Sequence, residues 1–406
     1  MVNSTPVHSL FSPEAVRERC NELYHIGIDG RLAHFDIDLS MIEVASKRVV
    51  TEIINNYPSL DVPFHSRWRH FEFEGSDLWG EIADREGLQG RERMIAEGDL
   101  AVISVLLDAG AGPKWKYRDD ITGLWLGRSE GLALASLRLF EKGFFSAVPE
   151  QPLRADALAL QTLSAKLLAS AMQVSNQNPL VGITQRAALL RRLGEAITAR
   201  PNVFQCKQTI RPGNLLVSLA GKNNLFARDI LVSLLTHLTD IWPSPIRLDG
   251  QPLGDVWHHS QLSRADVTDG LVPFHKLSQW LSYSLIEPLQ KAGSMVQEPD
   301  GLTGLGEYRN GGLFIDTGVI VPKDPATMVK VFKPADELIV EWRALTIALL
   351  DFVADKVRSL LGRTVEQLPL ASVLQGGTWS AGRRIADELR QNGGPPIRLD
   401  SDATVF

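Results

Sequence analysis

Several residue types and patterns are scarce in this chain of 406 residues. Its only cysteines are Cys20 and Cys206, far apart and without histidines at metal-ligand spacing, which excludes a disulfide framework and a zinc site. No long run of lysine and arginine occurs and the net charge is -6, which argues against a broad nucleic-acid-binding surface.

Long hydrophobic runs are also missing. The N-terminal stretch has no apolar core of signal-peptide length, and the most apolar later stretch, LTIALLDFVA from Leu345, is interrupted by Asp351. We therefore expect a soluble cytoplasmic protein without membrane association. The sequence also lacks a G-x-S-x-G elbow, a catalytic cysteine context, a P-loop and a G-x-G-x-x-G fingerprint.

What the chain does contain is material for a large, mainly α-helical core, with 44% hydrophobic and 22% charged residues. Helical periodicity is expected over residues 13–24, 41–55, 129–142, two helices within 155–200, 225–241, 272–291, 336–361 and 380–391. Short strands are expected near Phe35, Phe71 and Phe314, and the Asp29-Gly30 pair is a candidate hairpin turn. We interpret residues 1–406 as one unit, with a candidate division at 149–152 between parts 1–148 and 153–406.

The first candidate functional residue is Asp316, in the apolar run GLFIDTGVIVP, which has the composition of a buried strand. A carboxylate there loses hydration and must regain it from partners or a ligand. The alternative is that Asp316 lies at a strand end and accepts N–H groups of the turn at Thr317 and Gly318.

Two helices offer further polar groups. On the helix within 272–291, the 3.6-residue period places Lys276, Trp280, Tyr283 and Glu287 on one stripe, which indicates either a pocket wall or an ordinary amphipathic flank. On the helix 336–361, the period buries a row of apolar residues, turns Glu341 toward the same interior and points Arg343 away. The expected buried row is Leu338, Trp342, Leu345, Leu349 and Phe352.

Glycines precede the helix start in QGGTWSAGRRIADEL, where Arg383 and Arg384 would join free N–H groups in holding an anion. The default alternative is a glycine-rich turn into a solvated helix. In FHSRWRHFEF a strand would set His65, Arg67 and Arg69 on one side, suited to an anion or to a charged surface. The adjacent His258 and His259 have no third ligand, so we expect no metal and no other cofactor.

Together, the motifs EYRNGGLFIDTGVIVP, GRSEGLALASL, DVWHH, VPFHKLSQWLSYSL and GGTWSAGR resemble the fungal and bacterial uracil catabolism protein 4 family over nearly the whole chain. The resemblance implies a role in a route that opens the ring of a uracil nucleotide and passes through a ribosylurea species. A more distant similarity, in the order HKLSQWLSYSL, LFIDTGVIVP and ELIVEWRA, is to queuosine 5'-phosphate N-glycosylases of queuine salvage. It implies a DNA-glycosylase-like helical core and a functional Lys–Asp pair, which by motif falls on Lys276 and Asp316, although Thr317-Gly318 replaces a Tyr-Arg pair that follows the Asp.

These resemblances imply an N-ribosyl hydrolase that cleaves a ribosylurea, expected as its 5'-phosphate, to urea and ribose 5-phosphate. The expected catalytic residues are Asp316, Glu341 and Lys276, and Lys276 is expected to neutralise the phosphate. The expected substrate-binding residues are His275, Trp280, Tyr283, Tyr308, Arg309, Trp379, Arg383, Arg384, Arg67 and His258. The alternatives are a ureide or amide hydrolase of a ring-opened product and a non-enzymatic, metabolite-binding regulator; exposed helix faces would also suit a homo-oligomer.

Overall fold

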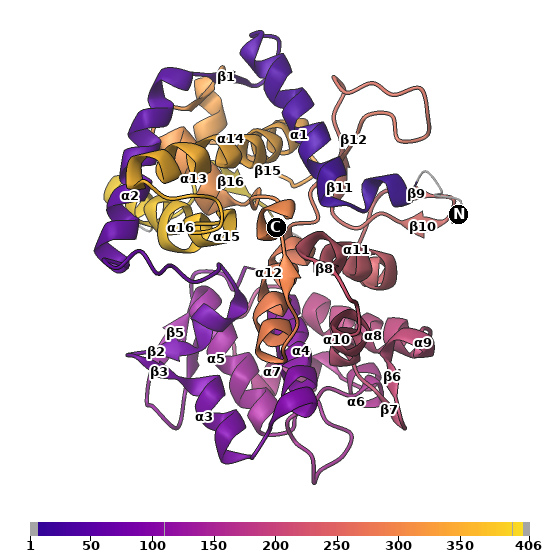
Figure 1. Ribbon diagram of the computed structural model, residues 1–406. Coiled ribbons are helices and arrows are strands. Elements are labelled where there is room, and N and C mark those ends of the chain that lie inside the picture. The colour runs from indigo at the N-terminus through magenta and orange to yellow at the C-terminus, as the bar shows by residue number, and fades with distance from the viewer. Residues whose placement is uncertain (1–6, 109, 392, 401–406) are drawn as a thin grey trace. The chain divides into compact units, whose positions relative to one another are not determined.

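The computed structural model describes residues 7–108, 110–391 and 393–400, and the chain divides into two compact units (Figure 1). Unit 1 comprises residues 7–65, 246–279 and 298–400, and unit 2 comprises residues 66–245 and 280–297, within the described ranges. Helix α12 (Lys276–Lys291) contributes its first turn to unit 1 and its remainder to unit 2. The stretch 149–152, the candidate division in the sequence, lies within unit 2.

Helices dominate both units, which confirms the mainly α fold class. The remaining helices of unit 1 are α1 (Pro13–Ile28), α2 (Ile42–Asn56), α13 (Tyr308–Asp316), α14 (Glu337–Leu361), α15 (Leu370–Val373) and α16 (Trp379–Leu389), with a π-helical turn, η8 (Leu374–Thr378). Its 3-10 turns are η1 (His8–Leu10), η2 (Leu39–Met41), η6 (Pro299–Gly301) and η7 (Pro325–Met328). Among the described residues, no helix is long and apolar enough to cross a membrane.

Unit 2 contains shorter helices around the long α4 (Gly90–Leu107). Its other helices are α3 (Leu78–Arg85), α5 (Arg128–Glu141), α6 (Ala157–Gln161), α7 (Ala165–Ala171), α8 (Ile183–Thr198), α9 (Pro201–Phe204), α10 (Leu215–Ala220) and α11 (Ala227–Leu238). Its 3-10 turns are η3 (Arg67–Phe71), η4 (Pro212–Asn214) and η5 (Thr239–Ile241).

The strands form isolated two-stranded pairs. In unit 1 these are β1 (Phe35–Ile37) with β14 (Ile320–Pro322), β9 (Arg247–Leu248) with β10 (Gln251–Pro252), β11 (Val256–His258) with β12 (Leu271–Pro273), and β15 (Val331–Phe332) with β16 (Arg398–Leu399). In unit 2 they are β2 (Glu72–Phe73) with β3 (Ser76–Asp77), β4 (Lys116–Arg118) with β5 (Trp125–Gly127), β6 (Gln205–Cys206) with β7 (Thr209–Ile210), and β8 (Leu225–Phe226) with β13 (Val296–Gln297). The pairs β15–β16 and β8–β13 are parallel and the others antiparallel.

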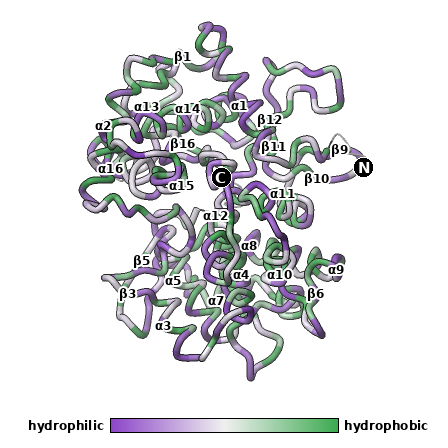
Figure 2. Tube along the Cα trace, in the orientation of Figure 1, coloured by the Kyte–Doolittle hydropathy of each residue, from purple (hydrophilic) through white to green (hydrophobic). Residues whose placement is uncertain are grey.

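Helix α14 forms the centre of unit 1, where it packs against α1, α2 and α13 (Figure 1). Its bounds and its buried Glu341 are as the periodicity predicts, but two expectations were wrong. Phe352 is 45% exposed, and Arg343 is 1% exposed instead of pointing away. Arg343 is buried because helix α14 is surrounded on more than one face, and a buried cation with carboxylate and carbonyl partners fits there. In Figure 2 the colour alternates along the helical segments, as expected for helices with apolar and polar faces.

The run around Phe314 is a helix, so the expected strand for Asp316 was wrong. Leu313, Phe314 and Ile315 are all buried, and periodicity cannot separate a buried strand from a short buried helix. Glu307 caps the start of α13. Gly318, with φ +82°, follows the end of the helix, and its N–H donates to the carbonyl of Ile315 at 3.0 Å.

The short strands expected near Phe35 and Phe71 are present as β1 and β2, but two related expectations were wrong. Residues 67–71 form the 3-10 turn η3, so His65, Arg67 and Arg69 do not share a strand face. The Asp29-Gly30 pair ends helix α1 and makes no hairpin, because the β1 strand that follows pairs with the distant β14. The expected helix 13–24 begins at Pro13 behind the Ser12 cap, as predicted, but continues to Ile28.

The two glycines of QGGT do not precede a free helix N-terminus, as the sequence suggested. They lie in η8, which joins α15 to α16 without a break. A Cβ on Gly377 would lie 2.4 Å from Cγ1 of Val49, and one on Gly376 would lie 2.7 Å from Cγ1 of Val62. The glycines therefore serve close packing against α2 and the chain that follows it.

Candidate active site

A buried ion pair fixes the start of helix α12. The carboxylate of Asp255 accepts two hydrogen bonds from the guanidinium of Arg343, both at 2.8 Å, and one from the indole N–H of Trp257 at 2.7 Å. It also accepts the backbone N–H of Lys276 at 3.0 Å, at the N-terminus of α12. Burial would raise the pKa of Asp255, but Arg343 and these hydrogen bonds outweigh it and lower the pKa. Asp255 is therefore held as an anion.

The same arginine fixes a buried loop, residues 302–307, that leads into α13. Nε of Arg343 donates to the carbonyl of Gly306 at 3.0 Å, and Nε2 of Gln279 donates to Oγ1 of Thr303 at 2.9 Å. A Cβ on Gly306 would lie 3.0 Å from the carbonyl oxygen of Arg343, so the loop lies tight against α14. The loop thus enters α13 in a single position.

Glu307 is the N-cap of α13 and the second carboxyl group of this cluster. Its oxygens accept the N–H groups of Arg309 at 2.7 Å and Asn310 at 2.6 Å, and the residue is buried. Burial raises the pKa of Glu307, although the charge of nearby Lys276 and the two N–H groups oppose the rise. Lys276, the first residue of α12, and Glu307, the N-cap of α13, therefore lie close enough for the lysine charge to act on the carboxyl group.

His65 is a third titratable residue on which the charge of Lys276 acts. Its Nδ1 is 2.8 Å from Oε1 of Gln375, and its ring centroid lies 6.1 Å from that of Trp379. The pKa of His65 falls to about 4, mainly because the ring is buried and also because the charge of Lys276 is near, while the bond to Gln375 opposes the fall. The imidazole is neutral at ordinary pH.

Trp379 also lines a pocket of about 550 Å³ on α2 and α16. Arg383, whose guanidinium carbon lies 5.6 Å from the Trp379 ring centroid, and Arg384 line it too, so three predicted binding residues share this pocket. Glu52, Asp387 and Glu388 line it as well, and Glu52 pairs with Arg384 at 2.7 Å. These carboxylates therefore partly neutralise the arginine charges at the predicted anion-binding site.

The cluster of Asp255, Lys276, Glu307 and His65 combines groups suited to acid–base chemistry on a polar substrate. Two carboxyl groups have pKa values displaced in opposite directions, and the charge of Lys276 acts both on the neutral imidazole of His65 and on Glu307. Such a cluster can stabilise a developing positive charge and hold hydroxyl groups.

Asp316, the carboxylate singled out from the sequence, lies at the other end of α13, about 13 Å from Glu307 along the helix axis at 1.5 Å per residue. Its two oxygens accept hydrogen bonds from Arg390 at 2.8 and 2.6 Å. Arg390 also donates to the carbonyl of Gly394, so the pair closes the chain after α16 onto α13.

The side chain of Glu341 is hydrogen-bonded to a different part of unit 1. Its Oε1 accepts the N–H groups of His34 at 3.1 Å and Phe35 at 2.9 Å, at the start of β1, and its Oε2 lies 3.4 Å from Nε2 of His259. These contacts give Glu341 a structural role between α14 and β1. The other histidine of the pair, His258, is exposed on β11.

The remaining predicted residues divide between the units. In unit 1, His275 is buried, has φ +49° and lies 3.0 Å through Nε2 from the carbonyl of Leu10. The guanidinium carbon of Arg309 lies 5.1 Å from the Tyr308 ring centroid, and Nη1 of Arg309 donates to the carbonyl of Gly393.

Trp280, Tyr283 and Arg67 belong to unit 2. Arg67 is fully buried there, with Nε donating to Ser104 at 2.6 Å and Nη1 to Asp108 at 2.9 Å. Its guanidinium carbon lies 5.4 Å from the ring of Trp280, so these two predicted residues do contact each other.

Sequence reasoning missed Glu307, although a signal was present. In the distant similarity the functional Asp is followed by a Tyr-Arg pair, and in this chain Tyr308-Arg309 follows Glu307, not Asp316. Asp255 was also missed, since only the histidines of DVWHH were weighed. His65 was placed on a strand that does not form.

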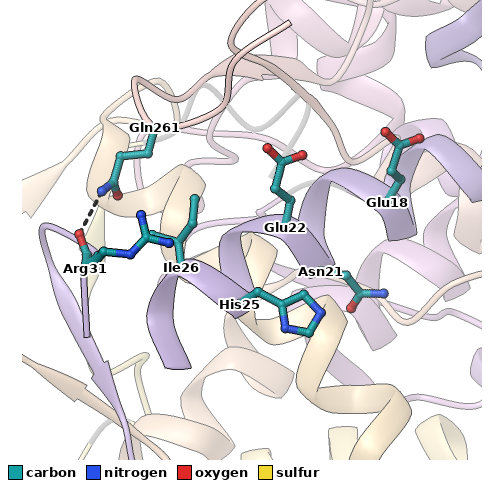
Figure 3. A pocket seen from close by; sticks show the side chains of 7 residues that line it. All are labelled: Glu18, Asn21, Glu22, His25, Ile26, Arg31 and Gln261. Carbon is teal, nitrogen blue, oxygen red and sulfur yellow. Dashed lines mark hydrogen bonds between the residues drawn. The ribbon is translucent and has the colours of Figure 1, made fainter. Parts of the chain in front are cut away.

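The pocket in Figure 3, of about 620 Å³, lies beside α1 and is lined by none of the residues of the cluster above. Its acidic side chains, Glu18 and Glu22, pair with Arg264 at 3.0 and 2.6 Å, and Gln261 donates to the carbonyl of Arg31 at 2.7 Å. Its polar groups therefore largely satisfy one another. Within the described ranges, no three His, Cys, Asp or Glu side chains are grouped to hold a metal ion.

Comparisons with known proteins agree with the resemblance noted in the sequence. The chain is 36% identical over 417 residues to Protein urg3 of Schizosaccharomyces pombe and 36% identical over 445 residues to Uracil catabolism protein 4 of Lachancea kluyveri. Each alignment covers 100% of this chain and 100% of the relative. A family model described as "Protein of unknown function (DUF1688)" matches residues 9–406, and the chain belongs to this family.

Proposed function

We propose that this protein acts in uracil catabolism as an N-ribosyl hydrolase, which cleaves a ribosylurea 5'-phosphate to urea and ribose 5-phosphate. The observation that carries the proposal is that the charge of Lys276, at the start of α12, acts on the buried Glu307 at the start of α13, with the start of α12 fixed by the Asp255–Arg343 pair. The name of the Lachancea kluyveri relative supports the pathway.

Cleavage of an N-glycosidic bond builds positive charge on the sugar carbon C1 and negative charge on the departing nitrogen. The Glu307 carboxylate would stabilise C1 or orient the attacking water, as carboxylates do in glycoside hydrolysis. Each oxygen of Glu307 accepts one backbone N–H and retains a lone pair for water or a ribosyl hydroxyl. Water adds to C1, the C1–N bond breaks, and the nitrogen takes a proton to leave as urea.

Lys276 would compensate the charge that develops on the leaving urea. An ammonium group beside a buried carboxyl group is effective there because the surroundings screen its charge less than water does. Its position at the first residue of α12, where Asp255 accepts the backbone N–H, fixes where the side chain starts. This differs from the phosphate-binding role that the sequence suggested for Lys276.

The 5'-phosphate would bind the pocket of Trp379, Arg383 and Arg384, where guanidinium groups can make paired hydrogen bonds to phosphate oxygens. Binding would displace Glu52 from Arg384. A phosphate anchored away from the reacting bond helps to position that bond.

Product analysis tests the proposal. Purified protein is incubated with N-ribosylurea 5'-phosphate and, separately, uridine 5'-phosphate, and the products are followed by mass spectrometry. Release of urea and ribose 5-phosphate in equal amounts from the first compound is the expected result. Release of ammonia with the ribosyl–nitrogen bond intact would contradict it and indicate a ureide hydrolase; binding without turnover would indicate a metabolite-binding regulator.

A further inference from the structure

The backbone of the chain segment that ends at His65 is hydrogen-bonded to α15. The N–H of His65 donates to the carbonyl of Ala371 at 2.9 Å, and Oγ of Ser372 donates to the carbonyl of Val62 at 2.8 Å. The backbone position of His65 is therefore set by α15, independently of its ring.

The π-helical turn η8 then brings Gln375 to the ring. Such turns are rare and often mark functional sites, because they break the regular register of a helix. Gly376 and Gly377 let the turn lie directly on α2, and Gln375 reaches His65 with its amide oxygen at 2.8 Å from Nδ1. The amide nitrogen of Gln375 lies 3.5 Å from the hydroxyl of Tyr57.

An amide oxygen only accepts hydrogen bonds, so this contact requires the hydrogen of the ring on Nδ1. In a neutral imidazole Nε2 is then the acceptor. A carboxylate in place of the amide would instead stabilise the imidazolium. A charged ring close to Lys276 would compete with it for Glu307.

We propose that Gln375 is a positioning residue, which fixes His65 as the neutral Nδ1–H tautomer so that Nε2 acts as an acceptor for a ribosyl hydroxyl in the Lys276–Glu307 site. The inference rests on the proposed function for the identity of the sugar. Burial and the charge of Lys276 act in the same direction, since both lower the pKa of His65.

The tautomer can be measured directly by NMR on protein with ¹⁵N-labelled histidine, with His65 assigned from the His65→Asn variant. Between pH 6 and 8 the expected spectrum is that of a neutral ring protonated at Nδ1, and saturating ribose 5-phosphate should shift the Nε2 signal. A ring protonated at Nε2, or a His65 spectrum unchanged by ribose 5-phosphate, would overturn the proposal.

The variant Gln375→Glu supplies a kinetic test, with Gln367→Glu as the control that adds the same charge at an exposed position without contact to the ring. The pKa of His65 should rise in Gln375→Glu, and kcat/KM should fall about tenfold below that pKa and recover above it. The control should keep the wild-type pH profile. A Gln375→Glu profile parallel to that of the wild type would contradict the positioning role.

The two readouts separate this inference from the proposed function. If the protein does not cleave ribosylurea phosphate, the hydrolase proposal fails, while the tautomer and the response to ribose 5-phosphate remain decided by NMR. If cleavage occurs but His65 is protonated at Nε2, only the role of Gln375 fails.

Discussion

The proposed role of Lys276 follows from the titratable residues near it. Its charge lowers the pKa of both Glu307 and His65, although the three residues lie far apart in the sequence. A lysine at a helix start is ordinary in sequence, so only the fold distinguishes it from the solvated flank that we kept as an alternative. The stripe of Lys276, Trp280 and Tyr283 was predicted; the partners of Lys276 were not.

Replacing Lys276 by Met should raise the pKa of Glu307, because the lysine charge that opposes the effect of burial is removed. If ionised Glu307 is required, the acid limb of the pH profile of kcat/KM should move to higher pH. Lys291→Met, at the other end of α12, removes the same charge and should leave this limb unchanged. An acid limb that does not move in Lys276→Met would show that Glu307 is not the titrating group.

His65 should make the fold sensitive to acid. Its pKa is about 4 in the fold, against about 6.5 in an unfolded chain, so between these values the unfolded state binds more protons. Stability is then retained above about pH 6.5 and lost as the pH falls, by up to about 3 kcal/mol. In urea unfolding from pH 4 to 7.5, the free energy of unfolding should depend less on pH in His65→Asn than in the wild type. A variant of the exposed His25 should show the same pH dependence as the wild type. Equal slopes in wild type and His65→Asn would contradict the assignment.

At the scale of elements, local signals determined helix starts well. Helix α1 begins at Pro13, where the predicted range 13–24 starts, behind the Ser12 cap. Helix α5 covers Arg128–Glu141, close to the predicted range 129–142, and Gly143, with φ +73°, follows its end. The helix at Asp316 was missed because a short run that is buried on all sides has no period to detect. The π turn was missed because its glycines serve a contact with α2, and α2 is more than 300 residues away in the sequence.

Helices α13 and α16 depend on a glycine for their close approach. A Cβ at Gly382 would lie 2.1 Å from the carbonyl oxygen of Arg309, which is backbone and cannot swing aside. Gly382→Ala should lower the free energy of unfolding by about 1–3 kcal/mol or more, as overpacking does. In Gly221→Ala the nearest atoms would lie at 3.7 Å, so little change is expected. Chemical denaturation of both variants tests this; equal stability would contradict the packing argument.

At the scale of the whole molecule, the sequence predicted the fold class but not the framework of the site. Asp255 and Arg343 are 88 residues apart in sequence, and Arg343 was expected to face solvent. Such pairings depend on which elements pack around α14, and the apolar periodicity of one helix gives no information about these neighbours.

Breaking this pair should be costly, because the remaining charge is left buried. Asp255→Asn or Arg343→Met alone should lose about 3–5 kcal/mol of stability. The double variant should lose less than the sum of the two, with a coupling of about 0.5–3 kcal/mol. Urea denaturation of the four proteins gives the coupling energy; strictly additive losses would mean that the two side chains do not stabilise each other.

The most direct test of the central claim compares Glu307→Gln with Asp316→Asn in the hydrolysis of N-ribosylurea 5'-phosphate. With Glu307 as the catalytic carboxylate, Glu307→Gln should lower kcat by at least about a thousandfold while circular dichroism remains native. Asp316→Asn should chiefly lower stability, since it weakens the ion pair with Arg390 and leaves the site intact. Full activity in Glu307→Gln, with activity lost in a folded Asp316→Asn, would contradict the account and return the site to Asp316.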